Sequence, residues 1–175
     1  MKKGLSVFLA FAVLASSVAA QEVTQSSNAP ATEQIFGPET NLPLPRFVSL
    51  KASTSNVRRG PSLSHRIDWV FQRKSMPLRV IAEYGHWRRV VDREGQGGWV
   101  HYTMLSGART VIVEDEIMIR RRPEPGAIEV AELEAGVVAR LGECDVNWCR
   151  LNVGGYRGWA MKDHLWGVAP DELRD

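Results

Sequence analysis

The sequence has few of the features that mark an enzyme or a metal protein. Its 175 residues include two cysteines and four histidines, and no two histidines fall at metal-ligand spacing. It has no Gly-X-Ser-X-Gly motif and no phosphate-binding loop. We therefore predict no metal site, no cofactor and no catalytic residue. An enzyme whose site is assembled from loops without a motif is a weaker alternative.

The net charge is also small. The chain has 22 basic and 20 acidic residues, and two of the basic ones, Lys2 and Lys3, lie at its start. Without them the basic total falls to 20 and the net charge is zero. Nucleic-acid binding depends on Lys and Arg side chains that neutralise phosphates, so a neutral chain disfavours it.

The longest apolar stretch lies at the start of the chain. Lys2 and Lys3 precede an apolar run over residues 5–18, which ends in small residues. This order is typical of a secretory signal peptide, to which we assign residues 1–20. A membrane anchor is the alternative, but the run is shorter than the ~20 residues that span a bilayer. We expect an exported protein, periplasmic or secreted, with no membrane span after cleavage.

Residues 21–45 are rich in Ser, Thr, Asn, Ala and Pro. They hold little that could pack in a core, so we expect a flexible, mostly disordered linker. The rest of the chain is divided into folded units over residues 46–109 and 110–168, followed by a C-terminal tail of residues 169–175.

An internal repeat of about 60 residues organises the folded part. Three anchors occur twice in the same order: Asn56-Val57-Arg58-Arg59-Gly60-Pro61 with Met118-Ile119-Arg120-Arg121-Arg122-Pro123, Trp87 with Trp148, and Gly98-Trp99-Val100 with Gly158-Trp159-Ala160. Their nearly constant offset indicates a duplication.

Both copies consist of short apolar runs broken by turn residues every eight to twelve or so positions, which is typical of all-β proteins. The segment 129–141 comes nearest to a helical period, but Gly136 and the β-branched Val137 and Val138 favour strands. About five short strands per copy predict a small closed β-barrel without exposed sheet edges. The short joint at residues 111–116 predicts a compact tandem with a shared interface.

These anchors resemble the bacterial SH3-like domain family. The resemblance rests on Asn56-Val57-Arg58-Arg59-Gly60-Pro61-Ser62, on Trp87, and on Gly98-Trp99-Val100 with Leu105 six residues after the Trp. The second copy is a weaker instance, because Met118 and Arg122 replace the expected Asn and Gly. The resemblance implies an all-β protein of two tandem SH3-like small β-barrels.

Members of that family are commonly exported and often attached to cell-wall hydrolases, where they bind peptidoglycan or its peptide stems. Here the two copies fill the folded part, which leaves no space in it for a catalytic domain. The resemblance implies a non-catalytic binding or scaffolding module whose partner is peptidoglycan, and a protein–protein adaptor in the cell envelope is the alternative. Nothing in the sequence indicates an oligomeric state.

Cys144 and Cys149 flank four residues, so a hairpin places them opposite each other on facing strands. Facing residues lie about 4.5–5.5 Å apart, within reach of a disulfide. Because exported proteins meet an oxidising environment, we predict a structural disulfide. A redox role calls for a closer Cys-X-X-Cys spacing. In the first copy we align Tyr84 and Arg88 with the two cysteines.

The candidate ligand-binding residues are aromatic or basic: Trp69, Phe71, Tyr84, Arg58 and Arg120. Trp69 does not repeat and lies with Phe71 in the longer loop region of the first copy, where an aromatic could serve a ligand groove. The alternative is that Trp69 covers the barrel mouth or packs on the second copy. The arginines could bind a carboxylate or phosphate, or else be solvated or paired with Glu.

Residues that repeat at matched positions are predicted to be structural, and they are Trp87, Trp99, Trp148, Trp159, Gly98, Gly158, Pro61 and Pro123. We expect Trp99 and Trp159 to be largely buried beneath the loops that precede their strands. Trp166 does not repeat and is expected to fill the interface or the end of the second barrel.

Overall fold

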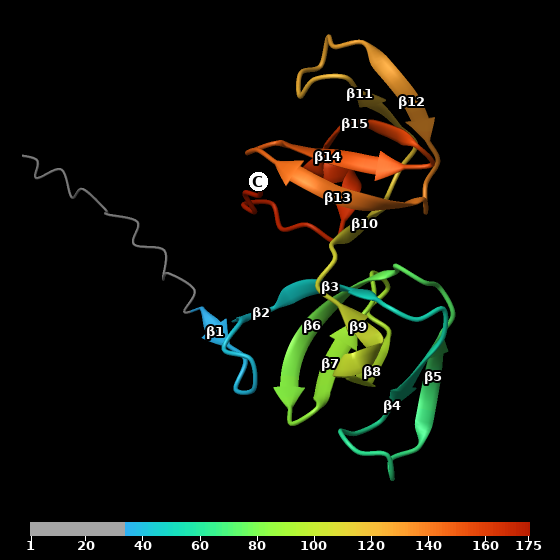
Figure 1. Ribbon diagram of the computed structural model, residues 1–175, viewed down its shortest axis with the longest axis vertical. Coiled ribbons are helices and arrows are strands. Elements are labelled where there is room, and N and C mark those ends of the chain that lie inside the picture. Colours follow the sequence, from blue (N-terminus) through green and yellow to red (C-terminus); the bar gives the residue numbers. More distant parts are fainter. Residues whose placement is uncertain (1–33) are drawn as a thin grey trace, which may run out of the picture. The chain divides into compact units, whose positions relative to one another are not determined.

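A computed structural model describes residues 34–175, so the expected signal peptide lies outside the described residues. The described part is all-β, as predicted, with two short 3-10 turns and no α-helix (Figure 1). None of its helical segments is long and apolar enough to cross a membrane.

The first repeat, residues 46–109, forms one antiparallel seven-stranded sheet of order β5-β4-β8-β7-β6-β3-β9 (Figure 1). Its elements are β3 (Arg46–Leu50), β4 (Ser55–Arg58), β5 (Ile67–Phe71), β6 (Pro77–Tyr84), β7 (Trp87–Val91), β8 (Gly97–His101), the 3-10 turn η1 (Tyr102–Met104) and β9 (Leu105–Ser106).

The second repeat, residues 110–168, forms a sheet of the corresponding order, β12-β11-β15-β14-β13-β10-β16. Its elements are β10 (Thr110–Val113), β11 (Ile117–Arg120), β12 (Glu129–Leu133), β13 (Val138–Cys144), β14 (Trp148–Val153), β15 (Tyr156–Met161), η2 (Lys162–His164) and β16 (Leu165–Trp166). Each strand therefore has a counterpart in the first repeat, which confirms the tandem repeat.

The sheets are not closed into barrels, contrary to the sequence prediction. Within residues 34–175, the two end strands of each sheet pair with one neighbour only. One end of each sheet, β9 or β16, is only two residues long and is already paired with β3 or β10. The opposite outer strand, β5 or β12, therefore keeps an edge that no strand of the described part covers.

The core of each repeat is mostly aliphatic. The cluster of the first repeat includes one residue of β2 (Pro43–Leu44) and consists of Leu44, Leu50, Val57, Phe71, Leu78, Val80, Val90 and Val100. Trp99 and Trp159 lie between buried and exposed, and neither belongs to the core cluster of its repeat, so how much each ring contributes to stability stays a prediction. Successive residues of a strand face opposite sides, and in β8 and β15 it is Val100 and Ala160 that point into the core.

Residues 34–45 are ordered, although their composition predicts a linker. β1 (Ile35–Phe36) pairs with β2 (Pro43–Leu44), and the turn between them binds the buried carboxylate of Glu83. The backbone N–H groups of Glu39 and Thr40 donate to Glu83 Oε2 at 3.1 and 3.0 Å, and the Thr40 hydroxyl donates to Oε1 at 2.7 Å. Polar contacts to a distant strand therefore fix the turn, and Leu44, which belongs to the core cluster, anchors the end of the segment.

The two repeats share an interface, as expected for a compact tandem. The Phe47 and Trp166 rings meet edge to face with their centroids 5.3 Å apart, and the Thr110 hydroxyl donates to the Ser75 carbonyl at 2.7 Å. The predicted position of the joint is wrong, because Val111 and the two residues after it form the buried strand β10. Residues 107–109 make the connection instead.

Candidate binding site

A groove of about 700 Å³ follows the outer strand β5 of the first repeat. The strand is apolar and yet exposed: Trp69 is 50% accessible, and Ile67 and Val70 are also exposed, whereas Phe71 points into the core. Among the described residues β5 pairs only with β4, so its other edge carries unpaired backbone groups. An exposed apolar edge of this kind is a template for another extended chain.

Asp92, just after β7, places a carboxylate in the same groove. The residue is only 6% accessible, and its Oδ1 accepts the backbone N–H of Gln96 at 2.8 Å. Burial raises the pKa of Asp92 above its ordinary value, because backbone hydrogen bonds offset only part of the lost hydration. No basic side chain of residues 34–175 pairs with it. The groove therefore combines apolar surface with a carboxylate that favours a positively charged ligand group.

The second carboxylate of the groove, Asp68, is already neutralised. Arg59 and Arg66 contact its two oxygens through their Nε atoms at 3.0 and 2.6 Å. Hydrogen bonding from Arg59 makes the largest contribution to a lowered pKa of Asp68. Asp68 therefore holds two exposed arginines in place, and Asp92 is the carboxylate that lacks a partner.

The second repeat has the same strands, but its outer strand β12 lacks the exposed apolar side chains of β5. Register places Ala131 at the position of Trp69, and Glu132 at the position of Val70. Charged side chains on an outer strand discourage pairing with a further chain. At the matched positions β12 therefore carries Glu129 and Glu132, where β5 has the apolar Ile67 and Val70.

The structure brings together two of the five predicted ligand-binding residues, Trp69 and Phe71, which both line the groove. Tyr84 is 63% accessible at the end of β6 and is not part of the groove lining. The sequence analysis missed Asp92. Its only signal is its place before the Glu94-Gly95 turn, which does not reveal that the chain folds the carboxylate inward.

The other two predicted residues, Arg58 and Arg120, hold loops. Nη1 of Arg58 donates to the carbonyls of Leu63 and His65 at 3.0 and 2.6 Å. Nη1 of Arg120 donates to the carbonyl of Ala127 at 3.0 Å, in the matching loop of the second repeat. Because both arginines fasten the loop after their strand, their repetition has a structural explanation.

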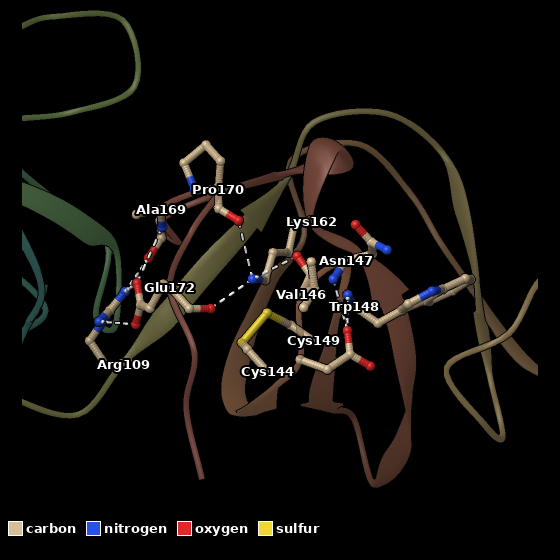
Figure 2. The surroundings of a disulfide bond; sticks show 12 residues. Arg109, Cys144, Val146, Asn147, Trp148, Cys149, Lys162, Ala169, Pro170 and Glu172 are labelled. Atoms are coloured by element: carbon tan, nitrogen blue, oxygen red, sulfur yellow. Dashed lines mark hydrogen bonds and ion pairs between the residues drawn. A yellow bond between two sulfur atoms is a disulfide. The ribbon is translucent and has the colours of Figure 1, made fainter. Parts of the chain in front are cut away.

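The predicted disulfide joins Cys144 and Cys149, which face each other on β13 and β14 (Figure 2). Close to it, the buried ammonium of Lys162 donates to the carbonyls of Val146, Pro170 and Glu172, at 3.1, 3.3 and 2.7 Å (Figure 2). The Glu172 carboxylate in turn binds Arg109 Nη1 at 2.7 Å. These contacts fasten residues 169–175 to the second repeat.

The counterpart of the disulfide in the first repeat is an ion pair. Glu83 faces Arg88 as Cys144 faces Cys149, with Glu83 Oε1 and Arg88 Nε 3.4 Å apart. The alignment of Tyr84 with Cys144 is therefore wrong by one residue. Glu83 is the counterpart of Cys144, because each facing pair encloses a turn of the same length.

These paired seven-stranded sheets, with matched strand order and matched loop arginines, define a tandem SH3-type protein. The model of the bacterial SH3 domain family matches residues 51–107 and 113–167. The chain belongs to this family. No curated protein matches the chain.

Several solved structures are similar to part of the chain. NlpC2 and NlpC1 from Trichomonas vaginalis each share 14% identity with it at a TM-score of 0.33, over 70% and 74% of this chain and 48% of theirs. An NlpC/P60 family protein from Bacillus cereus ATCC 10987 shares 13% identity at a TM-score of 0.32, over 69% of this chain and 55% of its own. The chain thus spans about half the length of these proteins.

Proposed function

We propose that this protein is a non-catalytic binding module of the cell envelope, which holds peptidoglycan by its peptide stems in the groove along β5. The observation that carries the proposal is the half-exposed Trp69 on an uncovered edge strand, beside the buried carboxylate of Asp92. Membership of the bacterial SH3 family supports a cell-wall ligand, because such domains are typically cell-wall-binding modules.

The binding mode follows from the geometry of the edge. An extended peptide adds to β5 through backbone hydrogen bonds, and one of its side chains packs on the Trp69 ring. A free amino group of the peptide pairs with Asp92. This contact lowers the pKa of Asp92 and compensates a charge that the folded protein otherwise holds without a basic partner.

Export is the second part of the proposal. The Cys144–Cys149 disulfide requires a compartment in which thiols become oxidised, and the family is consistent with an extracellular location. We propose that residues 1–20 direct the chain across the membrane and that the folded repeats act in the periplasm or outside the cell.

Co-sedimentation with purified cell wall tests the site. We expect Trp69→Ala to weaken wall binding by tenfold or more, because a stacked aromatic anchor contributes about 1.4 kcal/mol or more to affinity. Tyr156→Ala, which removes an exposed aromatic ring from β15 of the second repeat, is the matched control and should bind like wild type. Equal binding of wild type and Trp69→Ala would place the ligand elsewhere.

An adaptor for an envelope protein is the second candidate, because the backbone edge of β5 fits any extended segment. Cell wall stripped of its peptide stems separates the two functions. The peptidoglycan proposal expects binding to be lost with the stems. If the protein does not bind intact wall but makes a Trp69-dependent contact with a protein segment, the adaptor function is favoured.

A further inference from the structure

Two histidines of the first repeat, far apart in sequence, meet at one end of the β7–β8 ladder. His86 lies just before β7 and His101 ends β8, where it faces Trp87. The backbone N–H of Tyr102 donates to the His86 carbonyl at 2.9 Å, which extends the ladder by one contact. The two imidazole rings lie with their centroids 5.9 Å apart.

That separation suits two imidazoles that share one metal ion. With metal–nitrogen bonds of ~2.0–2.1 Å, two imidazoles on one ion have centroids about 4.5 Å apart at a right angle and about 6.4 Å apart when trans, and the observed 5.9 Å lies in this range. His101 Nδ1 lies 2.7 Å from the Thr103 hydroxyl oxygen. When Nδ1–H donates to that oxygen, Nε2 keeps its lone pair, and hydrogen bonds of this kind orient metal-binding histidines.

We propose that His86 and His101 bind one divalent transition-metal ion, preferentially Cu²⁺, with water in the other coordination positions. Neutral imidazole is a ligand for Cu²⁺, Ni²⁺ and Zn²⁺, and the general order of affinities places Cu²⁺ first. Residues 34–175 contain no cluster of three or more His, Cys, Asp and Glu side chains suited to a metal. The protein therefore supplies two ligands and leaves the ion open to a further ligand from solution.

The surroundings allow an ion to reach the pair. His86 is exposed, and His101 lines a groove of about 250 Å³. Arg88 lies beside this cluster, with its guanidinium carbon 6.0 Å from the Tyr102 ring centre. Its charge is compensated by Glu83, so repulsion of the metal is reduced.

The second repeat shows that the fold does not need these histidines. There the N–H of Lys162 donates to the Asn147 carbonyl at the same 2.9 Å, and Met161 faces Trp148 as His101 faces Trp87. Asn147 and Met161 thus occupy the positions of His86 and His101 in an equivalent backbone. The backbone of the ladder therefore does not require the histidine pair, whose rings in the first repeat also pack on Tyr102, with centroids 5.6 and 5.0 Å from its centroid.

The same comparison provides substitutions that the backbone accepts, His86→Asn and His101→Met. Copper(II) chloride is titrated into the full chain in a non-coordinating buffer, with calorimetry for the Kd and electron paramagnetic resonance for nitrogen ligation. We expect one Cu²⁺ per chain bound through two nitrogens, and each substitution should weaken binding more than tenfold. His65→Asn and His164→Asn, which remove histidines elsewhere, are the controls and should leave the Kd unchanged.

A further variant, Thr103→Ala, tests the orienting hydrogen bond and should weaken Cu²⁺ binding about tenfold. Thermal unfolding without metal establishes that each variant is folded. If His86→Asn does not fold, His101→Met alone tests the proposal. The proposal would be overturned if the chain did not bind one Cu²⁺ ion. It would also be overturned if His86→Asn or His101→Met left the Kd unchanged. A loss of affinity in the His65 or His164 control would overturn it as well.

Discussion

Asp92 is unfavourable for folding when ionised, and the proposed function gives its charge a role in binding. Its carboxylate is buried beside β5 and paired with no basic side chain of the described part of the chain. Because burial raises the pKa of Asp92, the folded state holds this proton more tightly than the unfolded chain does. At pH values above the ordinary pKa of 3.8, the ionised form of Asp92 therefore lowers the free energy of unfolding. This destabilisation disappears as the pH falls and the carboxylate is protonated.

Asp92→Asn separates stability from binding. The amide oxygen keeps the hydrogen bond from the Gln96 N–H, and the buried charge is removed. We expect the free energy of unfolding at pH 7 to be unchanged or raised by up to about 1 kcal/mol, and wall binding to weaken. Urea unfolding and co-sedimentation measure the two effects. A destabilised variant with normal wall binding would show that Asp92 serves the fold alone.

A tryptophan that stays partly accessible and lies outside the core cluster should contribute less to stability than a smaller core residue. Replacing Trp99 by Ala empties a site that water already reaches, so we expect a loss of about 1–3 kcal/mol rather than the ~3–5 of a fully buried ring. Leu78→Ala, at a fully buried position, should cost about 2–5 kcal/mol. Chemical unfolding compares the two variants, and a larger loss in Trp99→Ala would mean that the ring closes the core after all.

At the scale of the element, the two repeats stabilise the same hairpin by different chemistry. In the second repeat a disulfide links the facing pair, and in the first the Glu83 carboxylate binds Arg88 and the β1–β2 turn. Burial by itself raises the pKa of Glu83, but hydrogen bonds from Thr40 and Arg46 outweigh it and hold the pKa below its ordinary value. One carboxylate thus connects the hairpin to the N-terminal segment.

Glu83→Gln should be strongly destabilising, by about 3–5 kcal/mol, because it leaves Arg46 and Arg88 without their buried counter-charge. Glu143→Gln is the control: it breaks an exposed pair with Arg150 and should cost less than about 1 kcal/mol. Since the folded-state pKa of Glu83 is lowered, its contribution is present above the unfolded value near 4.5 and is lost as the pH falls below it.

Guanidinium chloride unfolding between pH 3 and pH 7 measures this dependence. The difference in unfolding free energy between wild type and Glu83→Gln should narrow as the pH falls below about 4.5. A constant difference over this range would show that the ionised form of Glu83 is not what stabilises the hairpin.

The elements that sequence predicts are those with local signals. The repeat anchors, the turns and the apolar alternation predict the strands of both repeats, and the cysteine spacing predicts the disulfide. The order of residues 34–45 could not be predicted, because it depends on Glu83, which is distant in the sequence. The same holds for Asp92 and for the His86–His101 pair, which only strand pairing brings to their sites.

At the scale of the whole molecule, the two repeats differ in features that matter for the proposed function. The first repeat has the uncovered apolar edge at Trp69, and the second has charged residues on the matching strand. The second repeat carries the disulfide and holds the C-terminal segment through Lys162. One copy can therefore tolerate features that favour binding while its neighbour adds stability across their interface.

If one repeat adds stability to the other, their unfolding must be coupled. A substitution of Phe47 tests this coupling. Its ring belongs to β3 of the first repeat, packs on Trp166 of the second, and lies 5.5 Å from the guanidinium carbon of Arg109. Phe47→Ala removes an edge-to-face aromatic contact and a cation–π contact, together about 1–2 kcal/mol. Because the contact with Trp166 crosses the interface, we expect the second repeat to lose stability although the substitution is in the first.

Amide hydrogen exchange resolves the effect, since it reports the opening of β13 and β14 separately from that of β6 and β7. In Phe47→Ala the core amides of β13 and β14 should exchange about tenfold faster, which corresponds to ~1.4 kcal/mol. Tyr84→Ala, an exposed aromatic substitution on β6, is the control and should leave exchange in the second repeat unchanged. If protection in β13 and β14 is the same in wild type and Phe47→Ala, the two repeats unfold independently, and the second does not stabilise the first.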